Sequence, residues 1–334
     1  MAALAKHMSA GQTLSLTEGG APCAAFAKIP NEESQGMRRC YYSGTESHPV
    51  YVDLLMPELS TRPPVVMLHG GCHTGSCYLS TPDGREGWAP RFARAGHPVH
   101  VVDWPGHGRS PMGPDFARLS GHDVIASVAA LLETTGPAIL LAHSASGPFV
   151  WALAEQVPDK VLGIVGVAPG GPANLLPDLP DDAKAIEALR YDEAAGCPVY
   201  CPQDAPFFVN PEFVSQYWIT GTRFPRQAMP AYVRSIVAES PRLMNERFNI
   251  GGRGIRVAHP DRLHAKPVLV LTGEHDPRHP RVVDEATARF VGGEFLWLPD
   301  LNIRGNGHMV MLEDNSDDIA DLILDWIDRT GLCA

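Results

Sequence analysis

The feature that most constrains this chain is an apolar run that ends abruptly at a serine between small residues. The run covers residues 137–142, the segment His-Ser-Ala-Ser-Gly follows at 143–147, and a helix-compatible stretch occupies 149–157. A strand that turns sharply into a helix exposes its turn residue at the carboxyl edge of a sheet, so Ser144 is a candidate nucleophile. The usual pattern is Gly-x-Ser-x-Gly, and here alanine and serine, which are also small, take the places of the two glycines.

A second apolar run, at residues 65–68, ends in His-Gly-Gly-Cys at 69–72. In serine hydrolases a loop of this kind offers a backbone N–H group to the oxyanion, and the residue after the nucleophile offers another. Glycine permits the close approach of backbone and substrate that this requires. The candidate oxyanion-hole donors are therefore the amides of Gly71 and Ala145, and the alternative is an ordinary turn at the end of a strand.

A general base and an acid are expected on two later loops. The segment Gly-Asn-Gly-His-Met at 305–309 is a loop that contains His308, and the strand expected at 267–272 is followed by Gly-Glu-His-Asp-Pro. We expect His308 to be the base and Asp276 to orient it and stabilise its cation, with Glu274 as the weaker candidate. The alternatives are a capping or surface histidine and a turn aspartate ahead of a proline.

Strands and helices alternate along most of the chain, which predicts a mostly parallel sheet with helices on both faces. The expected strands are 39–42, 50–55, 65–68, 98–103, 137–142, 160–167, 267–272 and 295–298, and the expected core helices are 86–95, 122–135, 149–157, 281–291 and a final one around 319–327. Residues 172–262 break this rhythm with many prolines and with helix-like pieces at 181–190, 211–220 and 227–238. We therefore predict an N-terminal arm (1–36), a core (37–171 and 263–334) and an inserted cap (172–262).

Composition argues against several classes of function. Of the 334 residues, 19% are charged and the formal net charge is −11, so the chain is a poor partner for nucleic acid or an anionic membrane. It has neither a P-loop nor a Gly-x-Gly-x-x-Gly pattern after a strand, and we expect no cofactor. Among the seven cysteines, Cys197 and Cys201 have no second Cys or His pair nearby, so we expect no metal site. The sequence leaves a homodimer open.

The sequence also carries an expectation about location. No run of 18 apolar residues occurs, so we expect no transmembrane helix. The first residues lack a basic head followed by a clear apolar stretch, which argues against a signal peptide and for a cytoplasmic protein. The alternative is a secreted protein whose signal has been removed.

With these residues in hand, the chain resembles the α/β-hydrolase superfamily, whose members carry serine, acid and histidine in the order seen here for Ser144, Asp276 and His308. It is most similar to a subgroup of bacterial alkaline esterases. The stretches that carry the resemblance are 69–70 with 81–88, 103–110, 143–147, and 305–309 with 321–327. The resemblance implies an α/β-hydrolase fold with an inserted cap, and the histidine loop is its most specific part.

One departure from the subgroup concerns the acid. In the subgroup the acid is a glutamate that follows the strand after the nucleophile helix and stands before a Pro-Gly pair. This chain has Ala168 before Pro169-Gly170. An alanine cannot orient a histidine, so either Asp276 takes over the role, which we favour, or the triad is incomplete.

These expectations combine into a serine-dependent hydrolase that cleaves a carboxylic ester or lactone through an acyl-enzyme. The cap is expected to set the choice of substrate, since apolar linings are typical of such pockets. The candidate pocket residues, each equally suited to the interior of the cap, are Phe207, Phe208, Tyr217, Trp218 and Met229. Two alternatives stay open: C–C cleavage, lyase or rearrangement chemistry on the same fold, and a non-catalytic binding protein.

Overall fold

A single twisted sheet organises the part of the chain that the structure, a computed structural model, describes (residues 38–333). Within those residues its strand order is β1-β2-β4-β3-β5-β6-β7-β8. The strands are β1 (Arg38–Gly44), β2 (Pro49–Leu55), β3 (Val65–Leu68), β4 (Val99–Asp103), β5 (Ala138–His143), β6 (Val161–Val167), β7 (Val268–Thr272) and β8 (Glu294–Trp297). The pairings of β2 with β1 and with β4 are antiparallel, and strands β3 to β8 pair parallel with one another, so the sheet is mostly parallel, as predicted.

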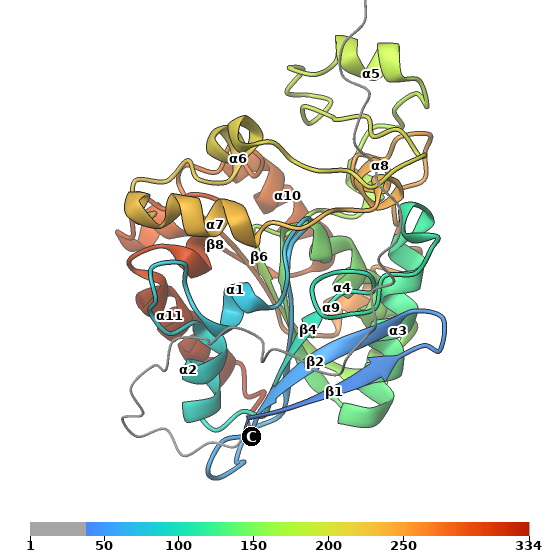
Figure 1. The fold of residues 1–334 in the computed structure, drawn as a ribbon. Coiled ribbons are helices and arrows are strands. Elements are labelled where there is room, and N and C mark those ends of the chain that lie inside the picture. Colours follow the sequence, from blue (N-terminus) through green and yellow to red (C-terminus); the bar gives the residue numbers. More distant parts are fainter. Residues whose placement is uncertain (1–37, 334) are drawn as a thin grey trace, which may run out of the picture. The chain divides into compact units, whose positions relative to one another are not determined.

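Helices cover both faces of this sheet, as Figure 1 shows. One face packs against α3 (Gly121–Thr135), α4 (Gly147–Gln156) and α10 (Arg281–Val291), and the other against α2 (Trp88–Arg94) and α11 (Ser316–Arg329). The short helices are α1 (Ser76–Leu79), α5 (Ala183–Ala188), α6 (Pro211–Tyr217), α7 (Met229–Ser235), α8 (Pro241–Arg247) and α9 (Asp261–His264). This three-layer architecture is the predicted fold class.

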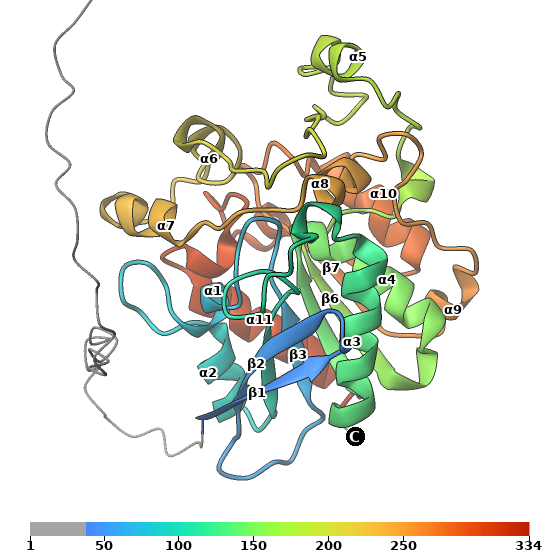
Figure 2. The same ribbon diagram turned by 45° about the vertical axis from the view of Figure 1, so that its right-hand side comes forward.

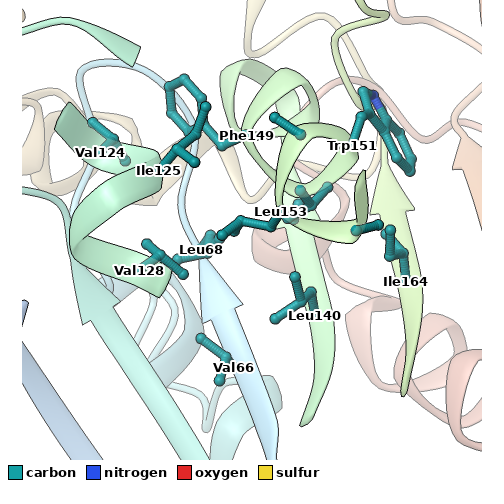
Figure 3. Packing of buried hydrophobic residues seen from close by; sticks show 14 of the residues in the cluster. Val66, Leu68, Val124, Ile125, Val128, Leu140, Phe149, Trp151, Leu153 and Ile164 are labelled. Carbon is teal, nitrogen blue, oxygen red and sulfur yellow. The ribbon is translucent and has the colours of Figure 1, made fainter. Parts of the chain in front are cut away.

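The two cores follow from alternation along the buried strands. In β3, Val66 and Leu68 belong to the core under α3 and α4, whereas Val65 and Met67 belong to the opposite core. Figure 3 shows Val66, Leu68 and Leu140 of the sheet beneath the side chains of these two helices. Each such fully buried aliphatic side chain contributes about 1.5–3 kcal/mol to folding. A sheet that is apolar on both faces holds the ends of its strands in fixed positions.

The segment between β6 and β7 carries α5 to α9, although these two strands are direct neighbours in the sheet. Figures 1 and 2 both show α5 to α8 gathered at one end of the sheet. We call residues 172–262 the inserted segment; its division from the core as a separate cap stays a prediction. The helix expected at 227–238 ends at Ser235, because the next residues are extended and pair with remote backbone. The sequence analysis missed α8 and α9.

Other expectations meet the structure in part. The expected N-terminal arm lies outside the described residues. Between residues 38 and 333, no helix combines the length and the apolar character needed to cross a membrane. The described cysteines are all free thiols, and Cys72 and Cys77 are buried.

Candidate active site

Ser144 occupies the turn between β5 and α4, in a strained backbone conformation. Its φ is 53°, in the left-handed region that non-glycine residues rarely adopt. Small neighbours make the turn feasible: Ser146 donates a 2.5 Å hydrogen bond to the carbonyl of His69. A Cβ on Gly147 would lie 2.2 Å from the carbonyl oxygen of Gly170, so only glycine fits there. The amide of Gly170 in turn donates to the Ser144 carbonyl at 2.7 Å, which fixes the turn.

His308 lies between Ser144 and Asp276. Its Nε2 is 3.0 Å from the hydroxyl oxygen of Ser144, and its Nδ1 is 2.6 Å from Oδ2 of Asp276. All three side chains are buried. A carboxylate only accepts, so the imidazole donates from Nδ1 and accepts the Ser144 hydroxyl at Nε2. This is the geometry of a hydroxyl poised to lose its proton to a base that an acid holds in place.

The electrostatics of this arrangement keep the histidine neutral and the aspartate charged. Burial alone would raise the pKa of Asp276, but His308 and His279 beside it hold that pKa at about 2. Burial lowers the pKa of His308, and the Asp276 charge offsets only part of this shift. A neutral imidazole beside a carboxylate is the state that a general base needs.

The choice between the two candidate acids is decided by contacts. Glu274 accepts hydrogen bonds from the Gly305 amide and from Arg304, at 3.0 Å and 3.3 Å, and makes none to His308. Ala168 follows β6, with a φ of 42° and a buried side chain that carries no polar group. Asp276 is therefore the carboxylate that reaches the imidazole.

The two predicted oxyanion-hole residues lie next to each other in front of Ser144. A Cβ built on Gly71 would lie 3.6 Å from the Cβ of Ala145. Both residues line a cavity together with Ser144 and His308. The other lining residues are Gly70, Cys72, His73, His143, Phe213, Trp218, Met244, Arg247 and Arg278.

The loop that carries Gly71 is fastened by the inserted segment. The buried carboxylate of Glu239 accepts from the Cys72 amide at 2.9 Å, and also from the Ser240 amide and from Nε2 of His107. The charge of Glu239 raises the pKa of His107 although burial opposes it. The Val237 amide donates to the carbonyl of Cys72 at 2.9 Å. These contacts hold Cys72 at a φ of 60° and so fix the direction of the loop.

A buried histidine, His73, also connects the Gly71 loop to the inserted segment. His73 donates from Nδ1 to the carbonyl of Gly71 at 2.7 Å and accepts at Nε2 from the hydroxyl of Tyr232. Burial lowers the pKa of His73 to about 4, so it stays neutral and this pattern persists at neutral pH.

The histidine loop has its own buried anchor in Glu313. Its carboxylate accepts from the Gly307 amide at 2.7 Å and from the Asn306 side chain at 2.6 Å. Burial raises its pKa to about 7, although these donors oppose the shift. From the other side, Nε2 of His143 donates to the carbonyl of His308 at 3.0 Å. Both contacts restrict where the His308 ring can lie.

Of the predicted pocket residues, only Trp218 lines this cavity. Phe207 pairs through its backbone with Glu239, and the alternation of an extended chain turns Phe208 outward, where it is 71% exposed. Tyr217 lies under the guanidinium of Arg278, and Met229 packs at the edge of the core. These four residues do not line the cavity around Ser144, and their role in a substrate pocket stays a prediction.

Asp276, His279 and His308 each present one candidate ligand atom, and these atoms lie within 4.8 Å of one another. Their hydrogen bonds favour proton chemistry instead: Nδ1 of His308 faces Asp276, and Nδ1 of His279 faces Asp284 at 3.0 Å. A metal ion would have to displace Asp276 from His308. The expectation of no metal site stays a prediction.

Several site residues had no assigned role in the sequence analysis. Glu239 and Glu313 each follow an apolar run, at 236–238 and 309–312, and a carboxylate at the end of such a run is the signal that could have found them. Arg247 and Arg278 carry no local signal, because only the fold brings them to the cavity.

Comparisons with known proteins agree with this architecture. The model of the alpha/beta hydrolase family matches residues 65–322. A probable secreted lipase of a fungal species (strain ATCC 74256) is 26% identical over 347 residues, which covers 85% of this chain and 87% of the lipase. A pimeloyl-[acyl-carrier protein] methyl ester esterase of Chromobacterium violaceum is 34% identical over 117 residues, 35% of this chain and 41% of that enzyme.

Solved structures agree at the level of the fold. An esterase of Exiguobacterium antarcticum has a TM-score of 0.61 at 15% identity, covering 86% of this chain and 98% of its own. The family match spans most of the sheet and reaches into the last helix, with the loops of Gly71, Ser144, Asp276 and His308 inside it. By its sequence and its fold, the chain belongs to the alpha/beta hydrolase family.

Proposed function

We propose that the protein is a serine-dependent hydrolase that cleaves a carboxylic ester or lactone through an acyl-enzyme. The observation that carries the proposal is a single buried imidazole, His308, within hydrogen-bond distance of both Ser144 and Asp276. The lipase and esterase relatives support an ester as the substrate.

The first half of the mechanism forms the acyl-enzyme. His308 takes the proton of Ser144 at Nε2 while the serine oxygen attacks the ester carbonyl. Asp276 keeps the imidazole in the required tautomer and stabilises the cation. The amides of Gly71 and Ala145 receive the oxyanion, and each such donor is worth about 3 kcal/mol of transition-state stabilisation. The C–O bond then breaks, and His308 returns the proton to the leaving alcohol.

The second half repeats these steps with water. His308 takes a proton from a water molecule that attacks the acyl-enzyme, and the same amides hold the second oxyanion. The acid is released and Ser144 recovers its proton. The Glu239 and Glu313 contacts serve this chemistry indirectly, since they hold the oxyanion loop and the histidine loop in place.

The test is hydrolysis of short-chain 4-nitrophenyl esters by the wild-type protein and by Ser144→Ala. We expect turnover by the wild type and a loss of roughly a millionfold in kcat in the variant. Ser215→Ala is the matched control, because Ser215 is an exposed residue of α6 whose hydroxyl donates to the carbonyl of Pro211. Retention of most activity by Ser144→Ala would end the proposal.

Location is a separate matter from chemistry. The expectation of a cytoplasmic protein stays a prediction. The similarity to a probable secreted lipase supports the secreted alternative.

A further inference from the structure

Two arginines stand in the wall of the cavity that contains Ser144. Arg247 is the last residue of α8, and Arg278 follows β7, two residues after Asp276. Both line the cavity together with the nucleophile and the base. The inserted segment and the sheet thus each bring one positive charge to the same small space.

Neither guanidinium has a carboxylate partner among residues 38–333. Arg278 donates to the carbonyl of Cys197 at 3.1 Å, and Arg247 makes no hydrogen bond or ion pair with any described residue. By contrast Arg242, on the same helix as Arg247, is paired with Glu246 at 2.8 Å. Two cations without a carboxylate partner in the wall of one cavity are unusual, because buried charges in proteins are as a rule paired.

Aromatic rings are the partners that these arginines do have. Both guanidiniums lie over the ring of Phe248, at 5.7 Å and 5.0 Å from its centroid, and Arg278 also lies over Tyr217. A cation–π contact recovers only part of the hydration that burial removes. Burial lowers the pKa of Arg247 to about 10, and the charge of Arg278 adds to this shift. The charges of Asp276 and Asp284 oppose part of this shift, so Arg247 stays cationic at neutral pH, although it makes no ion pair with a described carboxylate.

The nearby carboxylates are engaged elsewhere. Asp276 is held by His308, Glu239 by Cys72 and His107, and Glu246 by the Gly121 amide and Arg242. Asp284 is likewise engaged, by Thr272 and by Nδ1 of His279. Among the described residues no carboxylate is left to form an ion pair with either arginine, so both are open to the anion of a bound molecule.

Arg247 also lies beside the turn that carries the nucleophile. A Cβ built on Gly170 would lie 3.4 Å from Nη1 of Arg247, and the Gly170 amide is bonded to the carbonyl of Ser144. Arg247 and Ser144 line the same cavity, so one bound molecule can present a carboxylate to Arg247 and an ester to Ser144.

We propose that the substrate is an ester that carries a free carboxylate, which Arg247 and Arg278 bind while Ser144 attacks the ester carbonyl. The inference rests on the proposed function and adds the chemical class of the substrate. Guanidinium and carboxylate pair in a fork geometry that also orients the bound molecule. Hydrolysis by water would release an alcohol and an acid, one of which keeps the anchoring carboxylate.

The test compares acidic esters with neutral partners of the same shape. One pair is mono-4-nitrophenyl adipate and its methyl ester, with the carboxylate on the acyl side. The other pair is the butyrate ester of 4-hydroxybenzoate and that of methyl 4-hydroxybenzoate, with the carboxylate on the alcohol side. We expect the acidic member of at least one pair to have about tenfold or more higher kcat/KM, and the preferred pair tells which half carries the anion.

The variants Arg247→Gln and Arg278→Gln should each reduce the acidic-to-neutral ratio toward one, and Arg247→Lys should restore part of it. Arg289→Gln is the matched control, since it removes the same charge from a residue on α10 whose side chain is 76% exposed. It should leave the ratio of the wild type unchanged. The inference is overturned if neither acidic ester is preferred, or if the arginine variants leave the ratio as it is.

Calorimetric titration with adipate tests the anion site without relying on ester turnover, so its result can be told apart from that of the esterase proposal. We expect the wild-type protein to bind adipate, and Arg247→Gln to bind it at least about tenfold more weakly. Turnover of neutral esters without any binding of adipate would refute only the acidic substrate. Binding of adipate without turnover of any ester would refute the hydrolase and keep the anion site.

Discussion

Asp276 accepts a 2.6 Å hydrogen bond from Nδ1 of His308, from a position 32 residues earlier in the chain. The carboxylate stands after β7, whereas the position after β6 holds Ala168, whose side chain has no polar group. The arrangement of serine, imidazole and carboxylate is therefore complete in geometry in spite of that alanine. The same contact accounts for the depressed pKa of Asp276 and for the tautomer of His308.

Asp276→Asn should lower kcat on a neutral 4-nitrophenyl ester by about ten-thousandfold, because an amide presents a donor to Nδ1 and favours the wrong tautomer. Steady-state kinetics check this. Glu274→Gln is the matched control, since Glu274 bonds Gly305 and Arg304 and should matter little. A large loss in the control together with a small loss in Asp276→Asn would assign the role of acid to Glu274.

The pH profile of kcat/KM should rise from the acid side with a midpoint below the ordinary histidine value of 6.5, because burial lowers the pKa of His308. Activity needs the neutral imidazole, so it is lost as pH falls through that pKa. The charge of Asp276 raises the pKa of His308. Without that charge, the residual activity of Asp276→Asn should have a still lower midpoint. A wild-type midpoint above 7 would contradict this account of the site.

Glu239→Gln should destabilise the fold by about 3 kcal/mol, because a buried carboxylate with three donors is replaced by an amide that brings donors of its own. Urea denaturation measures the change. Glu187→Gln, on exposed helix α5, should change the free energy of unfolding by less than about 0.5 kcal/mol. The kcat of Glu239→Gln should also fall, since the Cys72 amide loses its anchor; an unchanged kcat would show that the oxyanion loop keeps its position without Glu239.

Gly147→Ala should cost about 2 kcal/mol or more, since the new Cβ would lie 2.2 Å from the carbonyl oxygen of Gly170. The Gly170 amide is bonded to the carbonyl of Ser144, so a shift of Gly170 should also move Ser144 and lower kcat. Gly113→Ala makes the same change where no atom lies within 4 Å, and it should leave both properties unchanged. Thermal unfolding and ester turnover, measured on both variants, separate the effect of the close contact from that of the added methyl group.

The parts of the fold that could be predicted are those with a local signal. Buried strands such as β5 and amphipathic helices such as α11 carry their periodicity in the sequence, and their predicted positions agree with the structure within a few residues. The helix expected at 227–238 is longer than α7, which ends at Ser235. Residues 236–239 pair with Cys72 and Phe207, far away in the chain, and no local pattern encodes such a pairing.

The site divides in the same way. Ser144, Asp276 and His308 each follow a recognisable strand or loop, so chain order was enough to predict that they meet. The cavity wall was not predictable, because it depends on how short helices of the inserted segment tilt. Phe208 points to solvent, whereas Arg247 and Met244, which attracted no attention in the sequence, line the cavity.

The most direct test of the central claim is covalent labelling with a fluorophosphonate, followed by peptide mass spectrometry. The account predicts one adduct, on Ser144, that is absent in Ser144→Ala and forms far more slowly in His308→Gln. Labelling of Ser144→Ala at the rate of the wild type, or a wild-type protein that does not react, would contradict it.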